Sequence, residues 1–404
     1  MSKDNISLSL WVMICVGCLV ALTSFGLRTA FGLFLGPITS DFGWQRESLS
    51  LALAIQNIFW GLAQPFAGAL CDRYGPRSVV IGGAAIYALG ILAIPYSTDP
   101  WMMYLTMGVM AGIGIGATSF AIIMSALSKV VPGEKRSTVM GIVTASGSLG
   151  QMVVVPSVQG YIDATTWQDA ILAMGITAAL VGMVALLLKN PVPKQEGPNQ
   201  FNALETLRCA GRTPSYILLT TGFFVCGFQV AFIGVHLPAF IVDNGLDPLL
   251  GATALACIGL FNIIGSYAAG LWGNKQSKVV GLSFIYFARS VATILFVTLP
   301  ITEVSVLIFA SVMGLLWLST VPLTSGLVAN FFGVRHMGML FGIVFLSHQF
   351  GSFLGVWLGG LLFDVTGSYD IVWWISIVLG VMAGFIHIPI KDRSYGEMVV
   401  QKST

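Results

Sequence analysis

The sequence is poor in charged residues. Asp, Glu, Lys and Arg make up only 9% of its 404 residues, whereas a soluble globular domain carries about 25%. Hydrophobic residues account for 56% of the chain. This composition excludes a water-soluble fold, a disordered chain, a coiled coil and a nucleic-acid-binding protein, and it predicts an integral membrane protein.

Long polar stretches are also scarce, because apolar segments recur along the whole chain. A membrane-spanning helix needs about 20 residues, and twelve segments reach that length, which predicts an all-α membrane protein with twelve transmembrane helices. We place them at residues 10–38, 48–71, 78–97, 100–129, 137–163, 167–189, 214–241, 249–271, 278–299, 303–331, 337–363 and 370–390.

The few charges are distributed unevenly between the two sides of the predicted membrane. Twelve spans put both termini on one side, and that side collects sixteen Lys and Arg residues, whereas the other receives only Arg46. Basic residues stay on the cytoplasmic side of membrane proteins. We therefore expect a multi-pass protein of the inner or plasma membrane with cytoplasmic N- and C-termini, whose first span is a retained helix.

One connection is longer than the rest. Residues 191–213 contain Pro191, Pro193, Gly197 and Pro198 and divide the spans six plus six. We predict an N-terminal six-helix bundle at 1–190, a cytoplasmic linker at 191–213 and a C-terminal six-helix bundle at 214–404. Related halves around a central site are a transporter architecture.

Clustered metal ligands and a nucleophile beside a base are both missing. The six cysteines lie within predicted spans or on the cytoplasmic side, where disulfides are disfavoured. Metal sites need grouped His, Cys or acidic side chains, and hydrolases need a base in reach of the nucleophile. We expect no metal, no cofactor and no enzymatic activity.

The connection between the second and third spans carries a distinctive sequence. It reads Gly68-Ala-Leu-Cys-Asp72-Arg73-Tyr-Gly75-Pro-Arg77, which resembles the signature loop of the major facilitator superfamily. The resemblance implies that Gly68, Asp72, Arg73, Gly75 and Arg77 form a cytoplasmic gating loop, and the six-plus-six layout extends it to the whole chain.

The first half further resembles the monocarboxylate-porter group, with oxalate and formate exchangers as neighbours. Residues 25–83 carry this resemblance, which implies that Arg28 occupies the position of a substrate-binding cation. The Asp and Arg that couple protons in the eighth helix of those porters are replaced here by Asn262 and Ser266. Proton symport of that kind is therefore not implied.

Acidic residues are absent from the middle of every predicted span, whereas two arginines, Arg28 and Arg289, lie well within spans. An arginine at the bilayer centre costs about 2.5–3.5 kcal/mol on insertion scales and does not lose its proton. Without a resident acid, the economical partner is a visiting anion held by the guanidinium fork. For Arg289 the alternative is a bond to backbone carbonyls between helices.

His348 is the best candidate within a span for carrying a coupling proton, although a packed histidine remains the alternative. Uniport and exchange need no such group. Further polar or aromatic residues on the presumed cavity helices complete the candidate substrate site: Gln349, Gln229, Trp317, Thr320, Gln151, Ser119, Asn57 and Trp60. Asn262 belongs to the same set.

The sequence thus predicts a secondary active transporter that moves a small mono- or dicarboxylate by alternating access. The partners would be the anion, protons or an exchanged anion, and membrane lipids; we expect a monomer. A proton-coupled drug exporter is the first alternative, although no embedded acid supports it. A membrane-embedded enzyme or receptor is a remoter one.

Overall fold

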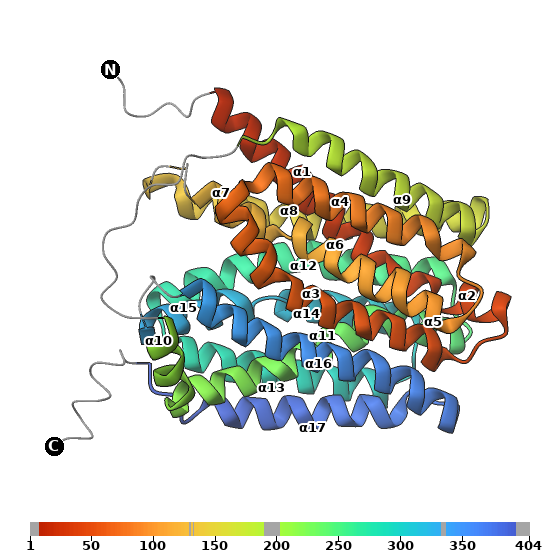
Figure 1. Cartoon of the computed structure of the whole chain (residues 1–404). Coiled ribbons are helices and arrows are strands. Elements are labelled where there is room, and N and C mark those ends of the chain that lie inside the picture. Colours follow the sequence, from red (N-terminus) through yellow and green to blue (C-terminus); the bar gives the residue numbers. More distant parts are fainter. Residues whose placement is uncertain (1–7, 129–130, 132, 190–202, 333–336, 393–404) are drawn as a thin grey trace.

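A computed structural model describes residues 8–128, 131, 133–189, 203–332 and 337–392 of the chain, and within these ranges it contains helices and no strand. The helices lie side by side along one common direction (Figure 1). The first half comprises α1 (Leu8–Ala30), η1 (Phe31–Phe34), α2 (Leu35–Phe42), α3 (Arg46–Tyr74), α4 (Pro76–Ala93), η2 (Ile94–Tyr96), α5 (Pro100–Met103), η3 (Tyr104–Met110), α6 (Ala111–Thr118), α7 (Phe120–Ser128), α8 (Gly133–Ala164), α9 (Trp167–Val184) and η4 (Ala185–Leu187).

The second half follows the predicted linker, in which a short helix, α10 (Ala203–Gly211), is described; residues 190–202 lie outside the described ranges. Its spans are α11 (Pro214–Asp243), α12 (Pro248–Lys275), α13 (Lys278–Thr298), α14 (Glu303–Leu316), α15 (Thr320–Phe332), α16 (Met337–Thr366) and α17 (Asp370–His387). In Figure 1 most of the first half lies above most of the second.

Helix starts follow local capping chemistry. The side chains of Thr166, Asp247 and Ser277 accept hydrogen bonds from backbone amides in the first turns of α9, α12 and α13, which satisfies donors that the helix leaves free. Gly75, with φ of +83°, joins α3 to α4. Only glycine adopts this backbone conformation readily, so the two helices turn sharply with one residue between them.

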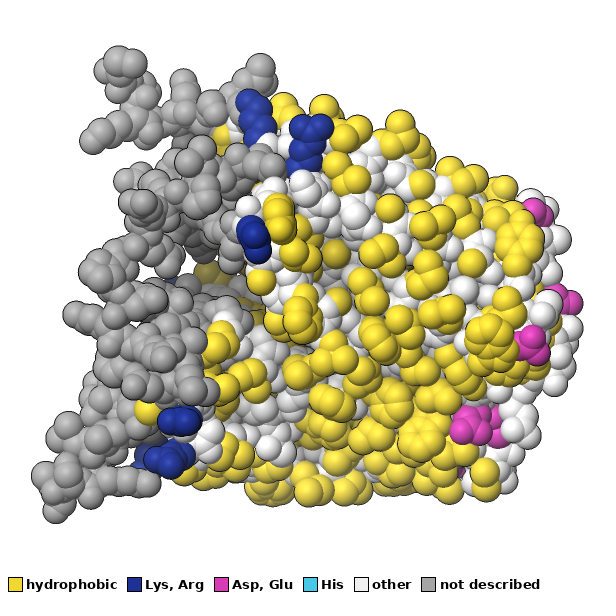
Figure 2. Space-filling model, viewed as in Figure 1, with side chains coloured by type: hydrophobic (Ala, Val, Ile, Leu, Met, Phe, Trp, Pro, Cys, Tyr) yellow, Lys and Arg dark blue, Asp and Glu magenta, His cyan; other side chains and the backbone are white. Residues whose placement is uncertain are grey.

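The protein has a basic end and an acidic end. Figure 2 shows a broad hydrophobic belt with Lys and Arg side chains toward one end and Asp and Glu side chains at the other. We call the end where α3 meets α4 the basic end, and the end where α2 meets α3 the acidic end. Eleven helical segments among the described residues are long and apolar enough to cross a membrane.

The predicted second span, α3, is the one outside that set of eleven. It is 29 residues long and therefore long enough, but its sequence contains Gln56, Asn57 and Gln64. Two of these polar residues are buried. The span is less apolar because α3 faces other helices and the interior of the protein rather than lipid alone.

The two halves are arranged as related bundles. Within the first half α1 packs on α8, and within the second half α11 packs on α16. Between the halves, α3 packs on α16 and α12 packs on α8. In span order, the first packs on the fifth as the seventh packs on the eleventh. Likewise, the second packs on the eleventh as the eighth packs on the fifth. These equivalent pairings are expected for structurally repeated halves.

The predicted tenth span, 303–331, is present as the apolar segment Glu303–Phe332, but it is not one continuous helix. Residues Trp317–Ser319 separate α14 from α15. Pro322 explains the interruption, because proline cannot donate to the carbonyl of Leu318 four residues earlier and its ring crowds that position. Leu318 instead accepts a hydrogen bond from the amide of Val321 at 3.0 Å.

Candidate functional site

A cavity lies between the two halves. Its wall in the first half comes from α1, η1, α3 and α8, and its wall in the second half comes from α11, α12 and the interruption before α15. The lining residues are Phe25, Arg28, Thr29, Phe31, Gly32, Leu53, Gln56, Asn57, Gln151, Val230, Ala231, Gly234, Val235, Leu255 and Trp317.

Arg28 contributes the one cationic side chain among these lining residues. Its Nη2 donates a hydrogen bond of 2.8 Å to Oδ1 of Asn57. The guanidinium carbon lies 4.6 Å from the centre of the Trp60 ring, a cation–π distance. Nε of Arg28 is buried and has no hydrogen-bond partner, so the guanidinium retains donors for another ligand.

No acidic side chain lines the cavity, and no Asp or Glu of the described ranges forms an ion pair with Arg28. An arginine fork holds a carboxylate with two parallel hydrogen bonds. The cavity volume is about 30 Å³, so little free space remains beside the guanidinium in this conformation.

Three other predicted site residues reach this cavity: Asn57, Gln151 and Trp317. Gln151 on α8 donates through Nε2 to the carbonyl of Leu255 on α12 at 2.9 Å, and this bond joins the two halves. Trp60 does not line the cavity but covers the guanidinium of Arg28. The cavity therefore has polar side chains from Arg28, Asn57 and Gln151, and aromatic and aliphatic walls around them.

Arg289 lies elsewhere, fully buried on α13 and outside the lining set. Its Nε and Nη2 donate to the carbonyl of Leu316 at 3.2 and 2.7 Å, and Nη2 also donates to the carbonyl of Trp317. Its Nη1 is 3.4 Å from Sγ of Cys226 and 3.4 Å from Oε1 of Gln229. This guanidinium is used inside the protein.

Three further candidates surround this cluster rather than the cavity. Gln229 donates to the carbonyl of Ser376 at 3.0 Å, and Oγ1 of Thr320 lies 3.3 Å from Sγ of Cys226. His348 is buried, with Nδ1 3.3 Å from Oε1 of Gln349 and its ring stacked on Phe345 at 5.7 Å.

Gln349, Asn262 and Ser119 also lie outside the lining set. Gln349 packs against Gly61 of α3, with Nε2 unpartnered. Asn262 donates through Nδ2 to Oγ of Ser148 at 2.8 Å, across the interface of the halves. Ser119 separates α6 from α7, and its hydroxyl donates to the carbonyl of Gly116 at 3.0 Å.

The predicted gating loop is mostly helical. Gly68 and Arg73 belong to α3, Gly75 is the single connecting residue, and Arg77 lies in the first turn of α4. The side chain of Asp72 lies outside the described part of the chain, although its backbone belongs to α3. The charge network that the resemblance implied therefore stays a prediction.

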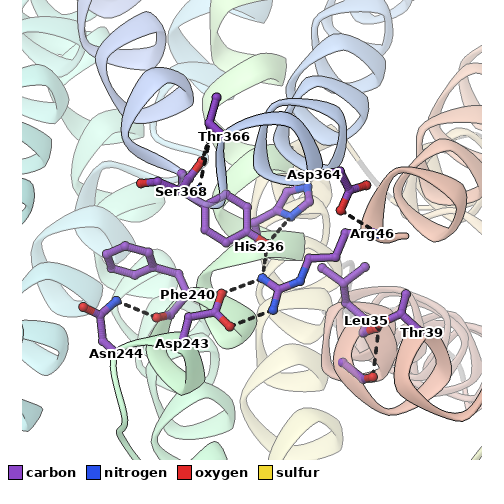
Figure 3. A network of polar contacts seen from close by, with 12 residues as sticks. Leu35, Thr39, Arg46, His236, Phe240, Asp243, Asn244, Asp364, Thr366 and Ser368 are labelled. Atoms are coloured by element: carbon purple, nitrogen blue, oxygen red, sulfur yellow. Dashed lines mark hydrogen bonds and ion pairs between the residues drawn. The ribbon is translucent and has the colours of Figure 1, made fainter. Parts of the chain in front are cut away.

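A polar network that sequence reasoning missed joins the halves at the acidic end (Figure 3). Arg46 donates from Nη1 and Nη2 to the two carboxylate oxygens of Asp243 at 2.5 and 2.7 Å. Its Nη1 also donates to the Tyr369 hydroxyl at 2.9 Å. Nδ1 of His236 lies 3.2 Å from that hydroxyl, and Nε2 lies 2.8 Å from the carbonyl of Val356.

Further contacts strengthen this network. Asp364 accepts hydrogen bonds from the backbone amides of Arg46 and Glu47, and Nε1 of Trp357 donates to Oε1 of Glu47 at 3.1 Å. Burial is the main cause that raises the pKa of Tyr369 above its ordinary value. The sequence held one signal for this network, because Arg46 is the single basic residue predicted on its side.

The described residues contain no group of three or more His, Cys, Asp or Glu side chains placed to hold a metal ion. All six cysteines are free thiols.

The lining of the cavity offers an arginine, amide groups and aromatic rings. This set is suited to binding a small anion by hydrogen bonds.

Comparisons with known proteins agree with this architecture. The family model of the Major Facilitator Superfamily matches residues 17–355. Two solved structures share the fold. The first is a bacterial homologue of the human lysosomal transporter Spinster in an inward-facing, occupied conformation, with a TM-score of 0.74, 13% identity and coverage of 96% of this chain and 99% of that one. The second is the D-xylose-proton symporter, with a TM-score of 0.72, 15% identity and coverage of 95% of this chain and 99% of that one.

Two of the curated relatives carry names from the group that the first half resembles. Monocarboxylate transporter 13 of Rattus norvegicus is 27% identical over 65% of this chain and 61% of its own length. The oxalate:formate antiporter of Oxalobacter formigenes is 23% identical over 72% of this chain and 69% of its own. The match to the first of these spans less than two thirds of that relative. The family match, the helical architecture and the relatives together show that this chain is a multi-pass membrane protein of the major facilitator superfamily.

Proposed function

We propose that this protein is a secondary active transporter that moves a small organic anion, a mono- or dicarboxylate, across the membrane. The observation that carries the proposal is the guanidinium of Arg28 in a cavity between the halves, with a free buried Nε and no acidic residue in the lining. A positive charge in a poorly hydrated site is costly unless a negative partner is present. The transported carboxylate would supply that partner.

The relatives support the same class of cargo. Their names refer to monocarboxylates and to oxalate and formate, all of which are small carboxylates. Arg28 in this chain offers the fork that binds a carboxylate bidentately, and Asn57 and Gln151 offer amide groups beside it. Cargo binding does not require chemical conversion, so we propose transport without enzymatic activity.

Alternating access would use the two ends of the molecule in turn. The acidic end is held together by Arg46, Asp243 and Asp364, so the described conformation corresponds to a state closed on that side. Basic residues favour the cytoplasm, and we therefore assign the basic end and both termini to the cytoplasmic side of the cell membrane. The protein would work as a monomer.

Transport of one anion can be coupled to a second solute. His348 is a buried titratable side chain within a span, and it lies beside Gln349, which packs against Gly61 of α3. We propose exchange against a second anion, with His348 as the proton carrier if a proton moves. pH-independent exchange would leave His348 without this role.

Counterflow in proteoliposomes tests the proposal. Vesicles loaded with one unlabelled carboxylate are presented with radiolabelled mono- and dicarboxylates, with lipophilic cations as the comparison that represents a drug exporter. We expect exchange of at least one carboxylate and its loss in Arg28→Gln, with partial retention in Arg28→Lys, which keeps the charge without the fork. Exchange of lipophilic cations alone, or undiminished carboxylate exchange by Arg28→Gln, would overturn the assignment.

A further inference from the structure

The interruption between α14 and α15 leaves backbone groups without their usual helical partners inside the membrane-spanning region. Backbone N–H and C=O groups at this depth need partners from the protein, because lipid offers none. The structure accounts for them locally in part: the amide of Trp317 donates to the carbonyl of Gly314 at 3.1 Å, and Oγ of Ser319 donates to the carbonyl of Leu315 at 2.6 Å. Three further groups of the interruption are the carbonyls of Leu316 and Trp317 and the amide of Leu318.

Side chains from two neighbouring helices supply partners for these three groups. Arg289 on α13 donates to both carbonyls, to that of Leu316 at 3.2 and 2.7 Å and to that of Trp317. Asn262 on α12 accepts through Oδ1 from the amide of Leu318 at 3.0 Å. The interruption is thus held from one side by a guanidinium and from the other by an amide.

Close helix packing brings Asn262 to the interruption. A Cβ at Gly265 would lie 1.8 Å from the carbonyl oxygen of Leu315, and a Cβ at Gly314 would lie 2.9 Å from that of Ile258. The two glycines therefore allow α12 and α14 to approach closely. At this spacing the short side chain of Asn262 reaches the backbone of the interruption.

The interruption matters because it carries Trp317, which is 3% exposed and lines the cavity opposite Arg28 in the second half. If the span were one continuous helix, the Trp317 indole would not keep the position that it has while Arg289 and Asn262 bind the backbone of the interruption. Arg289 itself does not line the cavity, and its donors are used on the protein.

We propose that Arg289 and Asn262 are positioning residues, which hold the interrupted tenth span so that Trp317 forms one wall of the anion cavity. This inference rests on the proposed function for its transport readout. Arg289 then makes no contact with the cargo, and Asn262 acts through Trp317 rather than by binding the cargo directly.

Hydrogen exchange tests the holding role without transport. We compare amide exchange of the 316–321 segment in the purified full-length protein and in Asn262→Ala, Arg289→Gln and Ser148→Ala. Ser148→Ala removes the acceptor of Asn262 Nδ2 and leaves the bonds of Asn262 Oδ1 to Leu318 and Ser266 intact. We expect about tenfold faster exchange in the first two variants, since local opening frees the amides, and unchanged exchange in Ser148→Ala. Unchanged exchange in Asn262→Ala would overturn the proposal.

A double-mutant cycle in the counterflow assay tests the action through Trp317. We expect Trp317→Ala and Asn262→Ala each to raise the KM for the anion about tenfold, because each removes or displaces the same wall of the cavity, with the maximal rate changed less. The double variant should match Trp317→Ala alone, because a residue that acts only through another adds nothing once that one is removed. Effects that multiply would overturn the positioning role.

Controls keep the two proposals separate. Ser283→Ala removes a buried hydroxyl of α13 that has no hydrogen-bond partner, so it should change neither readout and reports on nonspecific damage to that helix. If Arg289→Gln does not fold, Asn262→Ala and Trp317→Ala still complete the cycle. If the wild-type protein exchanges no carboxylate, the proposed function fails, whereas hydrogen exchange still decides whether Arg289 and Asn262 hold the interruption.

Discussion

Oδ2 of Asp364 accepts a hydrogen bond of 2.6 Å from the backbone amide of Glu47, and these residues belong to opposite halves of the protein. Oδ1 accepts a second bond, from the amide of Arg46 at 3.1 Å. Gln45, the residue before α3, provides no side-chain cap. The first turn of α3 is therefore capped by a side chain from α16, so separating the halves at this end removes the cap.

Asp364→Ala should weaken closure at the acidic end. A lost N-cap costs about 1 kcal/mol, which corresponds to about a fivefold shift between closed and open states. A cysteine introduced at Gly234, where a Cβ meets nothing within 4 Å, reports cavity access. Its labelling by a membrane-impermeant maleimide from the acidic side should become about fivefold faster.

Asp370→Ala is the matched control for this experiment. Asp370 is an exposed acid in the first turn of α17, so its loss removes a comparable charge at a helix start without touching the other half. Labelling should then stay at the wild-type rate. Equal acceleration in both variants would show that the cap from Asp364 does not stabilise closure.

The pair Arg46 and Asp243 should be energetically coupled. Their side chains are 18% and 28% exposed, so solvent screening limits the expected coupling to about 0.5–1 kcal/mol. We expect this value from the thermal stability of Arg46→Gln, Asp243→Asn and the double variant, with a decrease at high salt. Arg46→Gln combined with Asp370→Asn should be additive, and coupling of the same size there would argue against a specific pair.

Asn57→Asp should reduce anion affinity without unfolding the protein. Asn57 already accepts from Arg28 at 2.8 Å, so the introduced carboxylate would become a resident counter-ion and compete with the cargo. We expect the KM in counterflow to rise at least tenfold, about 1.4 kcal/mol, with thermal stability equal or higher. Asn57→Ala, which adds no charge, should raise the KM less; anion exchange by Asn57→Asp at wild-type KM would contradict the role of Arg28.

Gly351→Ala should destabilise the second half by about 1–3 kcal/mol through overpacking. A Cβ at Gly351 would lie 1.9 Å from the carbonyl oxygen of Phe224 on α11, and backbone cannot move aside easily. Gly342 lies on the same helix with nothing within 4 Å of its Cβ position. Gly342→Ala should therefore be neutral or slightly stabilising, and equal melting temperatures for the two variants would refute the packing argument.

Several features of the fold were predictable from local sequence. Apolar length placed the spans, and the confirmed all-α membrane fold follows from the need to satisfy backbone groups within each helix. The interruption of the tenth span was not predicted, although Pro322 signalled it, because apolar length alone does not distinguish one helix from two.

The candidate site was harder to predict. Arg28, Asn57, Gln151 and Trp317 do line one cavity, whereas Arg289 is buried among backbone carbonyls. Both arginines look alike in sequence, since each lies within an apolar span without an acid nearby. The difference between them is set by which neighbouring backbone reaches each guanidinium.

The sequence alone determined that this chain crosses the membrane many times, because the low charge and the recurring apolar length have no other stable solution. It also determined that one side is basic. Only the tertiary structure decided which polar residues share a cavity and which hold the halves together. Residues such as Arg46 and Asp364 lie far apart along the chain, and the packing of helices brings them within hydrogen-bonding distance.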